Sequence, residues 1–177
     1  MIFRETRLKG AFVVEMERRE DHRGYFARTW CAEEFRSHGL NISMVQANTA
    51  HSKVRGTLRG MHMQKAPYGE AKLIRCIRGA IYDVMLDVRP DSATFKEWVS
   101  VELDEKSNLM LFVPEGFAHG YQALRDDTEV FYLVSQFYSP ECETGVRYDD
   151  PAFRIQWPIR DVALISEKDR SWPDFLG

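Results

Sequence analysis

The stretch AIYDVMLDV, residues 80–88, decides the fold of this chain. Alternate residues of the stretch, from its first to its last, are apolar or aromatic and share one face of an extended segment, while Asp83 and Asp87 lie on the opposite face. Turn-forming residues flank the stretch at 78–79 and 89–92. The pattern therefore predicts a β-strand between two turns.

Further runs rich in β-forming residues recur along the chain between turn signals. They occupy residues 12–17, 25–30, 45–50, 73–77, 98–103, 109–113, 120–124 and 129–138. Helix is scarce, since we expect only a short helix at 32–38, ended by Gly39, and the start of another at 166–170. Short strands at this spacing predict an antiparallel sandwich or barrel, and a jelly roll is the natural candidate because it limits exposed sheet edges.

Length and composition fit one compact domain spanning residues 1–177. The chain is 44% hydrophobic and 29% charged, and its net charge of −3 gives no general field for nucleic acid or membranes, so we expect neither as a partner. Charges interrupt the N-terminal segment, which argues against a secretory signal, and the densest apolar run, 109–113, is far too short to span a bilayer. Three widely spaced cysteines predict reduced thiols in a cytoplasmic protein.

Two histidines stand in segments of unusual local composition. His62 follows Gly60 in a strand-like run at 56–64, where the glycine indicates a bulge or a close backbone approach. His119 follows a Pro/Gly turn at 114–116, near the mouth of a strand, where barrels often bind ligands. Either histidine could instead serve the structure, His62 by bonding a carbonyl in the core and His119 as an incidental part of a hairpin.

Tyr132 and Asp169 are candidates for acid–base chemistry. Alternation over 131–138 puts Tyr132 and Tyr138 on one face, where tyrosines usually pack in a core or rim but can also donate a proton into a barrel. Asp169 follows Ser166 at the spacing of a capping box, so it could simply serve a helix N-terminus. Alternatively its carboxylate could orient a histidine and support its positive charge.

Three basic residues are candidates for anion binding. Arg23 lies in a turn with Asp21, where an exposed ion pair would contribute little, but together with Arg59 its guanidinium would match the oxygens of a diphosphate. Lys72 alternates with Leu73 in a predicted strand, and strand lysines usually face solvent. If Lys72 points into the barrel, its burial requires an anionic partner such as an oxyanion.

Together these segments resemble one family, the dTDP-4-dehydrorhamnose 3,5-epimerases of the cupin superfamily. The matching residues run in order along nearly the whole chain. They are Asp21-x-Arg23-Gly24-x-Phe26, Gln46-Ala47-Asn48, Arg59-Gly60-Met61-His62-x-Gln64, Lys72-Leu73, Asp83-Val84, Asp87-Val88-Arg89, 114–120, 132–138, Asp149-Asp150-Pro151, Trp157-Pro158 and Ser166-x-Lys168-Asp169. The resemblance implies an all-β, cupin-type jelly-roll barrel with short peripheral helices.

The resemblance also implies an activity. Members act on a nucleotide-diphosphate 4-keto-6-deoxyhexose, usually a dTDP sugar of rhamnose or deoxysugar biosynthesis, and invert C3, C5 or both through an enolate. By resemblance, His62 is the base with Asp169 as its partner, Tyr132 is the proton donor, and Lys72 stabilises the enolate oxygen. Substrate contacts are implied for Arg23, Phe26, Gln46, Asn48, Arg59, His119, Tyr138 and Lys168.

The resemblance implies no redox cofactor, because the reaction does not change the oxidation state of the sugar, and no metal is expected either. Gln64 stands where metal-binding cupins carry the second histidine of a His-x-His pair. His62, Glu70 and His119 would remain as a reduced ligand set, which leaves a metal-dependent cupin enzyme as one alternative. A non-catalytic cupin that binds sugar nucleotides is another, since fold alone does not establish activity.

Two positions depart from the family pattern. Arg28 stands where many members carry a glutamate, and Met63 stands where an aromatic or aliphatic residue is common, so the identity of the nucleotide and the details of the sugar pocket are left open. Family members are homodimers whose N-terminal strands cross to the partner. By resemblance, residues 3–17 and the neighbouring strands are expected at that interface.

Overall fold

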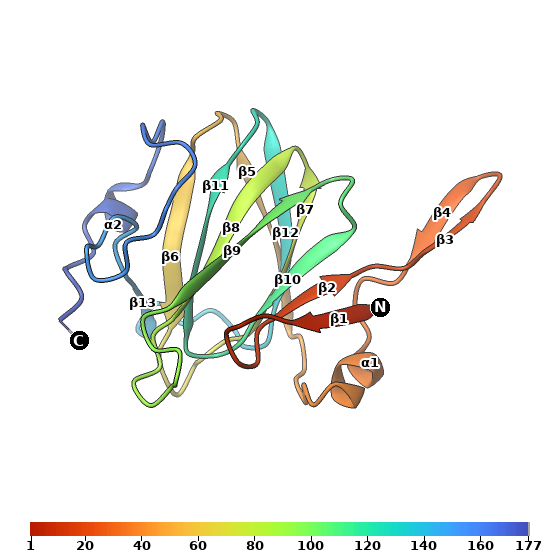
Figure 1. Cartoon of the computed structure of the whole chain (residues 1–177), viewed down its shortest axis with the longest axis horizontal. Helices are drawn as coiled ribbons and strands as arrows, with labels where there is room; N and C mark the ends of the chain where they lie inside the picture. The colour runs from red at the N-terminus through yellow and green to blue at the C-terminus, as the bar shows by residue number, and fades with distance from the viewer. Residues whose placement is uncertain (177) are drawn as a thin grey trace.

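The computed structural model describes residues 1–176, and two antiparallel β-sheets that face each other form its body (Figure 1). The six-stranded sheet contains, in spatial order, β1 (Ile2–Glu5), β2 (Phe12–Glu15), β10 (Leu109–Val113), β7 (Lys72–Arg78), β12 (Thr128–Val134) and β5 (Gln46–Ser52). The five-stranded sheet contains β13 (Glu143–Gly145), β6 (Leu58–Gln64), β11 (Phe117–Ala123), β8 (Ala80–Asp87) and β9 (Trp98–Asp104). The predicted antiparallel all-β architecture is confirmed.

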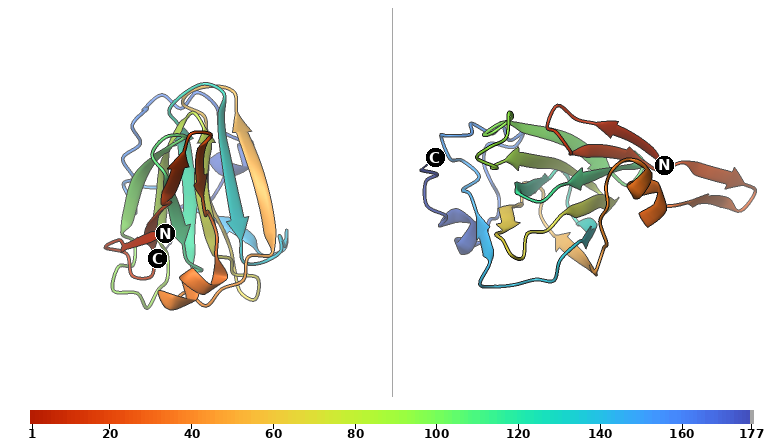
Figure 2. Two further views of the ribbon diagram at one scale, coloured as in Figure 1. Left: turned by 90° about the vertical axis from the view of Figure 1, so that its right-hand side faces the viewer. Right: turned by 90° about the horizontal axis from the view of Figure 1, so that it is seen from below.

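Three small elements lie outside the two sheets. A hairpin of β3 (Arg18–Asp21) and β4 (Gly24–Ala27) projects away from the body of the molecule (Figures 1 and 2). The helices are α1 (Ala32–Ser37) and α2 (Glu167–Arg170), close to the two predicted positions. Within residues 1–176, no helix has both the length and the apolar character needed to cross a bilayer.

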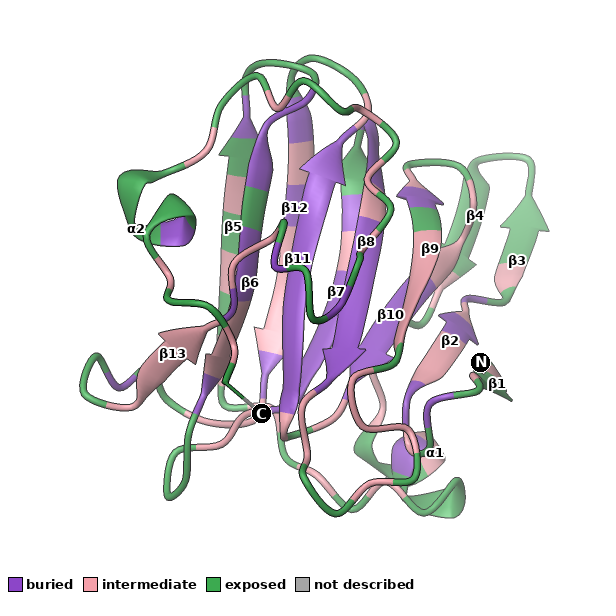
Figure 3. Cartoon of the chain, turned by 60° about the vertical axis from the view of Figure 1, so that its left-hand side comes forward, coloured by how far each residue is buried: buried purple, intermediate pink, exposed green. Residues whose placement is uncertain are grey.

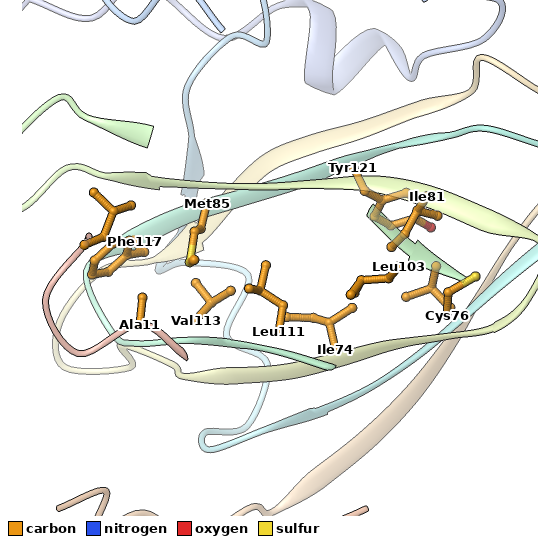
Figure 4. Close-up of a cluster of buried hydrophobic side chains, with 12 residues drawn as sticks. Ala11, Ile74, Cys76, Ile81, Met85, Leu103, Leu111, Val113, Phe117 and Tyr121 are labelled. Atoms are coloured by element: carbon orange, nitrogen blue, oxygen red, sulfur yellow. The ribbon is translucent and has the colours of Figure 1, made fainter. Parts of the chain in front are cut away.

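Apolar side chains fill the space between the sheets and also cover both outer faces. The central cluster draws on both sheets, with Ile74 and Leu111 from one facing Ile81 and Met85 from the other (Figure 4). A second cluster packs the outer face of the six-stranded sheet against Phe35 of α1. A third packs the outer face of the five-stranded sheet against the segment that follows β13. Burial of this kind stabilises the chain by roughly 25 cal/mol per Å² of apolar surface.

Strand β8, which contains most of the stretch 80–88, is buried on both of its faces (Figure 3). Its residues Val84 and Leu86 belong to the outer cluster, whereas Met85 belongs to the central one. Asp83 and Asp87 are therefore fully buried as well, with 0% of each residue exposed. A buried carboxylate is tolerated only when it is paired, and both residues have partners described below.

The largest differences between predicted and observed strand bounds concern three strands. The run 129–138 leaves the sheet after Val134, so the prediction that Tyr138 shares a strand face with Tyr132 is wrong. The run 120–124 begins earlier, at Phe117. The run 25–30 ends at Ala27.

Three further strands, β1, β3 and β13, were not predicted from the sequence. The residues of β3 are Arg-Arg-Glu-Asp, which have no apolar alternation, because this strand pairs with β4 away from the core.

Candidate active site

A cavity of about 490 Å³ lies between the two sheets, beside α2. Six strands and the segment before α2 contribute its walls. The lining residues are Ala50, Thr57, Leu58, Arg59, His62, Lys72, His119, Tyr121, Val130, Tyr132, Glu143, Leu164, Ile165, Ser166, Lys168 and Asp169. All four predicted catalytic residues are therefore brought together, along with three of the predicted substrate contacts.

His62 and Asp169 form a close pair at this cavity. The Nε2 of His62 lies 2.6 Å from Oδ1 of Asp169, and Oδ2 of the same carboxylate accepts a 3.1 Å hydrogen bond from the backbone N–H of Gly60. Burial alone would raise the pKa of Asp169, but the hydrogen bonds from His62 and Gly60 outweigh it, so the pKa is lowered. The carboxylate is thereby kept ionised beside the imidazole.

The capping interpretation of Asp169 accounts only for its backbone. Ser166 is the N-cap of α2, and its hydroxyl accepts the N–H of Asp169 at 3.0 Å, as in a capping box. The carboxylate itself is bonded to His62 and Gly60. The alternative prediction, a carboxylate that orients a histidine, agrees with this geometry.

Gly60 makes the close approach that its position in a strand indicated. Its φ is +123°, and a Cβ added there would lie 2.5 Å from the Cα of Gly120 on β11. The register of β6 against β11 shifts between His119 and Tyr121, which is the predicted irregularity. No larger residue fits at Gly60 without separating the two strands.

His119 has a buried carboxylate of its own, which the sequence analysis missed. Its Nε2 lies 2.5 Å from Oδ1 of Asp83, and only 8% of His119 is exposed. Asp83 lies on β8, directly across from Tyr121 of β11. Asp83 matched a family motif, yet nothing in the alternation of β8 indicated which side chain it would meet.

Lys72 points into the cavity and is 8% exposed, so the solvent-facing alternative is wrong. Its ammonium is paired with Oε1 of Glu70 at 3.1 Å and lies 3.5 Å from the carbonyl oxygen of His62. Tyr132 lines the same cavity from β12, and its burial, with a smaller contribution from Glu70, raises its pKa. The phenol is therefore held in its protonated form at neutral pH.

A second hollow of about 300 Å³ adjoins the first and shares His62, Lys72, Tyr132 and Glu143 with it. Gln46, Asn48 and Tyr138 line this second hollow, so these predicted substrate contacts lie beside the cavity. Gln46 donates to Asn48 Oδ1 at 3.0 Å.

Glu143, which the sequence analysis did not single out, lies between the two hollows. Its carboxylate accepts the hydroxyl of Tyr138 at 2.6 Å and is paired with the ammonium of Lys168. Burial alone would raise the pKa of Glu143, but the hydrogen bonds from Lys168 and Tyr138 lower it overall. Glu143 thus holds two of the predicted substrate contacts in place.

The two predicted arginines are far apart in this structure. Arg59 lines the cavity, and its guanidinium donates to the carbonyl of His51 at 2.8 Å and to Ser52 Oγ at 3.3 Å. Arg23 lies on the projecting hairpin, where it is paired with Asp21 at 2.6 Å (Figure 1).

Phe26, on the same hairpin, is 65% exposed. Neither Arg23 nor Phe26 lines the cavity of its own chain.

A metal-dependent enzyme would need a set of ligand side chains within residues 1–176. No group of three or more His, Cys, Asp or Glu side chains there is arranged to hold a metal ion. Glu70, a member of the reduced ligand set considered above, is paired with Lys72. His62 and His119 each point Nε2 at a separate carboxylate.

Comparisons with known proteins agree with this geometry. The family model for dTDP-4-dehydrorhamnose 3,5-epimerase matches residues 5–176. The curated dTDP-4-dehydrorhamnose 3,5-epimerase of Methanothermobacter thermautotrophicus is 45% identical over 173 residues, covering 96% of this chain and 92% of that protein.

Solved structures agree as well. The dTDP-4-dehydrorhamnose 3,5-epimerase of Bacillus anthracis, with TDP and PPi bound, has a TM-score of 0.94 and 38% identity, covering 98% of this chain and 99% of that one. The dTDP-6-deoxy-D-glucose-3,5-epimerase of Legionella pneumophila, in complex with dTDP-4-keto-L-rhamnose, has a TM-score of 0.89 and 31% identity, covering 95% and 89%.

The similarity in sequence and in fold spans nearly the full length of the chain and of these relatives. The two-sheet barrel is therefore the cupin-type fold that the sequence resemblance implied. The chain belongs to the dTDP-4-dehydrorhamnose 3,5-epimerase family and is an isomerase of dTDP-linked 4-keto-6-deoxyhexoses.

Proposed function

We propose that this enzyme inverts C3 and C5 of its keto-sugar by proton transfer between His62, the sugar and Tyr132. The observation that carries the proposal is the shared cavity, where the His62–Asp169 pair, Tyr132 and Lys72 all reach the same space. The 4-keto group acidifies the hydrogens on both neighbouring carbons, so one base beside the ring can act at C3 and at C5 in turn.

His62 is the base in this proposal. Its Nε2 proton is engaged by Asp169, which leaves Nδ1 as the basic nitrogen. When Nδ1 takes a proton from carbon, the positive charge on the ring is stabilised by the buried, ionised carboxylate of Asp169. Proton transfer by a positioned side chain typically accelerates a reaction by about 10²–10⁴-fold.

Tyr132 returns a proton to the opposite face of the ring. The location of its phenol in the same cavity as His62 supports this role, because a donor must reach the sugar that the base also reaches. Lys72 supplies positive charge where the enolate oxygen develops, and its pairing with Glu70 keeps the ammonium in the cavity before substrate arrives. Every step moves only protons, so we propose no cofactor and no metal.

The charged and polar residues around the cavity suit the dTDP portion of the substrate. Arg59, His119 and Lys168 offer positive charge or hydrogen-bond donors for the diphosphate, since guanidinium and ammonium groups bind phosphate oxygens well. The second hollow, lined by Gln46, Asn48 and Tyr138, adjoins the sugar site. TDP in the Bacillus anthracis relative and dTDP-4-keto-L-rhamnose in the Legionella pneumophila relative support this class of ligand.

Arg23 and Phe26 would reach a substrate only from a second copy of the chain. The hairpin that carries them projects from the body, and Phe26 exposes 65% of its surface there. An exposed phenylalanine beside an arginine suits contact with a nucleotide base and a phosphate in a neighbouring site. We therefore propose a homodimer in the cytoplasm in which each hairpin completes the partner's nucleotide site.

Incubation of the enzyme with dTDP-4-keto-6-deoxyglucose in heavy water tests the proposal. NMR of the product is expected to show deuterium at both C3 and C5, with both centres inverted. Label at C3 alone would restrict the enzyme to one centre. Binding without any label would make the protein a sugar-nucleotide binder instead. Activity lost on treatment with a chelator and restored by a metal would favour the metal-dependent alternative.

A further inference from the structure

We infer that Asp150 is a positioning residue for the reaction, because it fastens the C-terminal segment that holds Asp169 against His62. That segment, residues 171–176, is called the C-terminal strap below. The inference rests on the proposed function, since it assumes that His62 is the base. Asp150 belongs to the Asp149-Asp150-Pro151 motif, to which the proposed chemistry assigns no task.

Helix α2 cannot set the position of Asp169 without outside support. It has four residues, and isolated helices of that length are not stable in water. Asp169 is its only buried residue. The segment before α2 is held by Leu164, whose carbonyl accepts the N–H of Leu58 at 2.8 Å. The strap provides the support on the other side.

Asp150 binds the strap through a buried carboxylate. The residue is 2% exposed, and its Oδ2 accepts the backbone N–H of Phe175 at 2.7 Å. Its Oδ1 accepts the backbone N–H of Ala152 at 2.8 Å, so both oxygens are engaged by main-chain donors. Hydrogen bonds to an ionised acceptor are roughly twice as strong as neutral ones. Asp150 thus fixes the strap at its far end.

The strap is also packed onto the strand pair that carries the base. The ring of Trp172 lies over Gly145, where an added Cβ would be 2.7 Å from Cε2 of that ring. Gly145 of β13 is the register partner of His62 on β6. The ring of Phe175 lies 5.0 Å from that of Phe153, measured between ring centroids.

These contacts fix both residues of the His62–Asp169 pair relative to the same pair of strands, β6 and β13. His62 is carried by β6, and Asp169 is carried by a short helix whose following residues are clamped to β13 and to Asp150. Release of the clamp would let α2 shift relative to β6, and the 2.6 Å contact in the dyad would lengthen. A misplacement of about 1 Å can reduce a catalysed rate by about 10²-fold.

Substitution of Asp150 in the full-length enzyme tests the inference. Asp150→Ala is expected to lower kcat by about 10–100-fold, with a smaller loss in Asp150→Asn, which keeps the volume and one acceptor oxygen. KM should change little, because none of residues 171–176 lines the cavity. Asp150→Asn also serves as the working variant if Asp150→Ala does not fold.

A spectroscopic readout separates positioning from general destabilisation. The imidazole proton between His62 and Asp169 should give a downfield resonance, assigned by its disappearance in His62→Asn. In the Asp150 variants this resonance should shift upfield or broaden. The control is Val99→Ala, a packing change on β9 that should lower the melting temperature but leave both the resonance and kcat unchanged.

The outcomes are distinct for the two proposals. Asp150 variants that melt at a lower temperature but keep kcat and the downfield resonance would show that the contact between Asp150 and the C-terminal strap is purely structural. The inference would then be overturned. Wild-type enzyme that exchanges no hydrogen at C3 or C5 would overturn the proposed function instead. The resonance would still report on the strap in that case, because it does not depend on turnover.

Discussion

His62 and His119 are cross-strand partners in the β6–β11 pair, and each directs its Nε2 at a different buried carboxylate. His62 meets Asp169 from α2, whereas His119 meets Asp83 from the neighbouring strand β8. Two imidazoles that are direct register partners on neighbouring strands are thus oriented by separate carboxylates. Only in the His62 pair does the carboxylate come from a short helix, α2, and only this pair is proposed to transfer the proton.

Removal of the base should abolish hydrogen exchange. We expect His62→Asn to lose detectable deuterium incorporation at both C3 and C5, because the proposed mechanism uses His62 as the base at both carbons. The measurement is NMR of substrate recovered from heavy water. His38→Asn is the control, since His38 lies on the outer face beside α1 and stacks on Phe3. Exchange at a normal rate in His62→Asn would refute the assignment of the base.

Removal of the carboxylate partner should be nearly as severe. Asp169→Asn keeps the shape of the side chain but loses the charge that stabilises a protonated His62, so we expect kcat to fall by about 10²–10⁴-fold. The rate of exchange at C3 and C5 reports the effect directly. Unchanged exchange would mean that Asp169 serves only the N-terminus of α2, where its backbone N–H donates to Ser166 Oγ.

Removal of the phenol should separate exchange from inversion. In Tyr132→Phe the base can still remove and return a proton on its own face, so some deuterium should enter while inversion is lost. NMR of the sugar distinguishes the two, because coupling constants report configuration. Tyr82→Phe, on the outer face of β8 against Trp157, is the matched control. Full inversion by Tyr132→Phe would mean that another group donates the proton.

Mixing two inactive variants should restore activity if the hairpin completes the partner's site. A His62→Asn chain and an Arg23→Ala chain, refolded together, should form mixed dimers with one intact site each. Random pairing would leave about a quarter of all sites intact, as expected for a two-fold dimer. The rate is measured at low substrate concentration, before and after co-refolding. No recovery, in a mixture shown to contain mixed dimers, would place Arg23 outside the site.

Acid should remove a specific part of the stability of the fold. Burial would raise the pKa of Asp87, but hydrogen bonds from Arg89, Ser92 and Thr94 outweigh it and lower the pKa from 3.8 to about 2. A lowered pKa stabilises the folded state above the unfolded-state value, and this contribution disappears as the pH falls from about 4 to about 2. It amounts to about 2 kcal/mol at neutral pH.

Denaturant unfolding of Asp87→Asn against wild type checks this contribution. The difference in unfolding free energy should be about 2 kcal/mol at pH 7 and should shrink as the pH approaches 2. Asp91→Asn, on the exposed loop that follows, is the control and should match wild type. A difference that stays constant down to pH 2 would mean that Asp87 acts through packing and not through its charge.

Period-2 alternation, a short-range property, indicated the barrel, and the resemblance to a known family indicated seven of the residues that line the cavity. The sequence could not identify Asp83 as the partner of His119, since that contact depends on how β8 aligns with β11 across 36 residues of sequence. The sequence pattern predicted a strand that extends to Tyr138, because Gln136 and Phe137 continue the alternation. The observed strand ends at Val134. Strand register and strand ends are set by tertiary packing.

The positions of Arg23 and Phe26 in the structure could not be predicted from sequence periodicity, for a different reason. Their resemblance to nucleotide-contacting residues implied a place in the site, yet within one chain they lie on a hairpin that projects from the body. A contact made between two chains leaves no periodicity in either of them. Their assignment stays a prediction that the mixing experiment addresses.

Gly60 and Gly120 bring the main chains of β6 and β11 together so closely that a methyl group added to either would clash with the other strand. The wall of the cavity that carries both imidazoles therefore has no room for larger side chains at these two glycines. Attempts to adapt the enzyme to bulkier sugars should substitute residues of β5, β12 and the segment before α2, which form the other walls. Libraries that randomise 59–62 or 119–121 are expected to yield mostly misfolded or inactive protein.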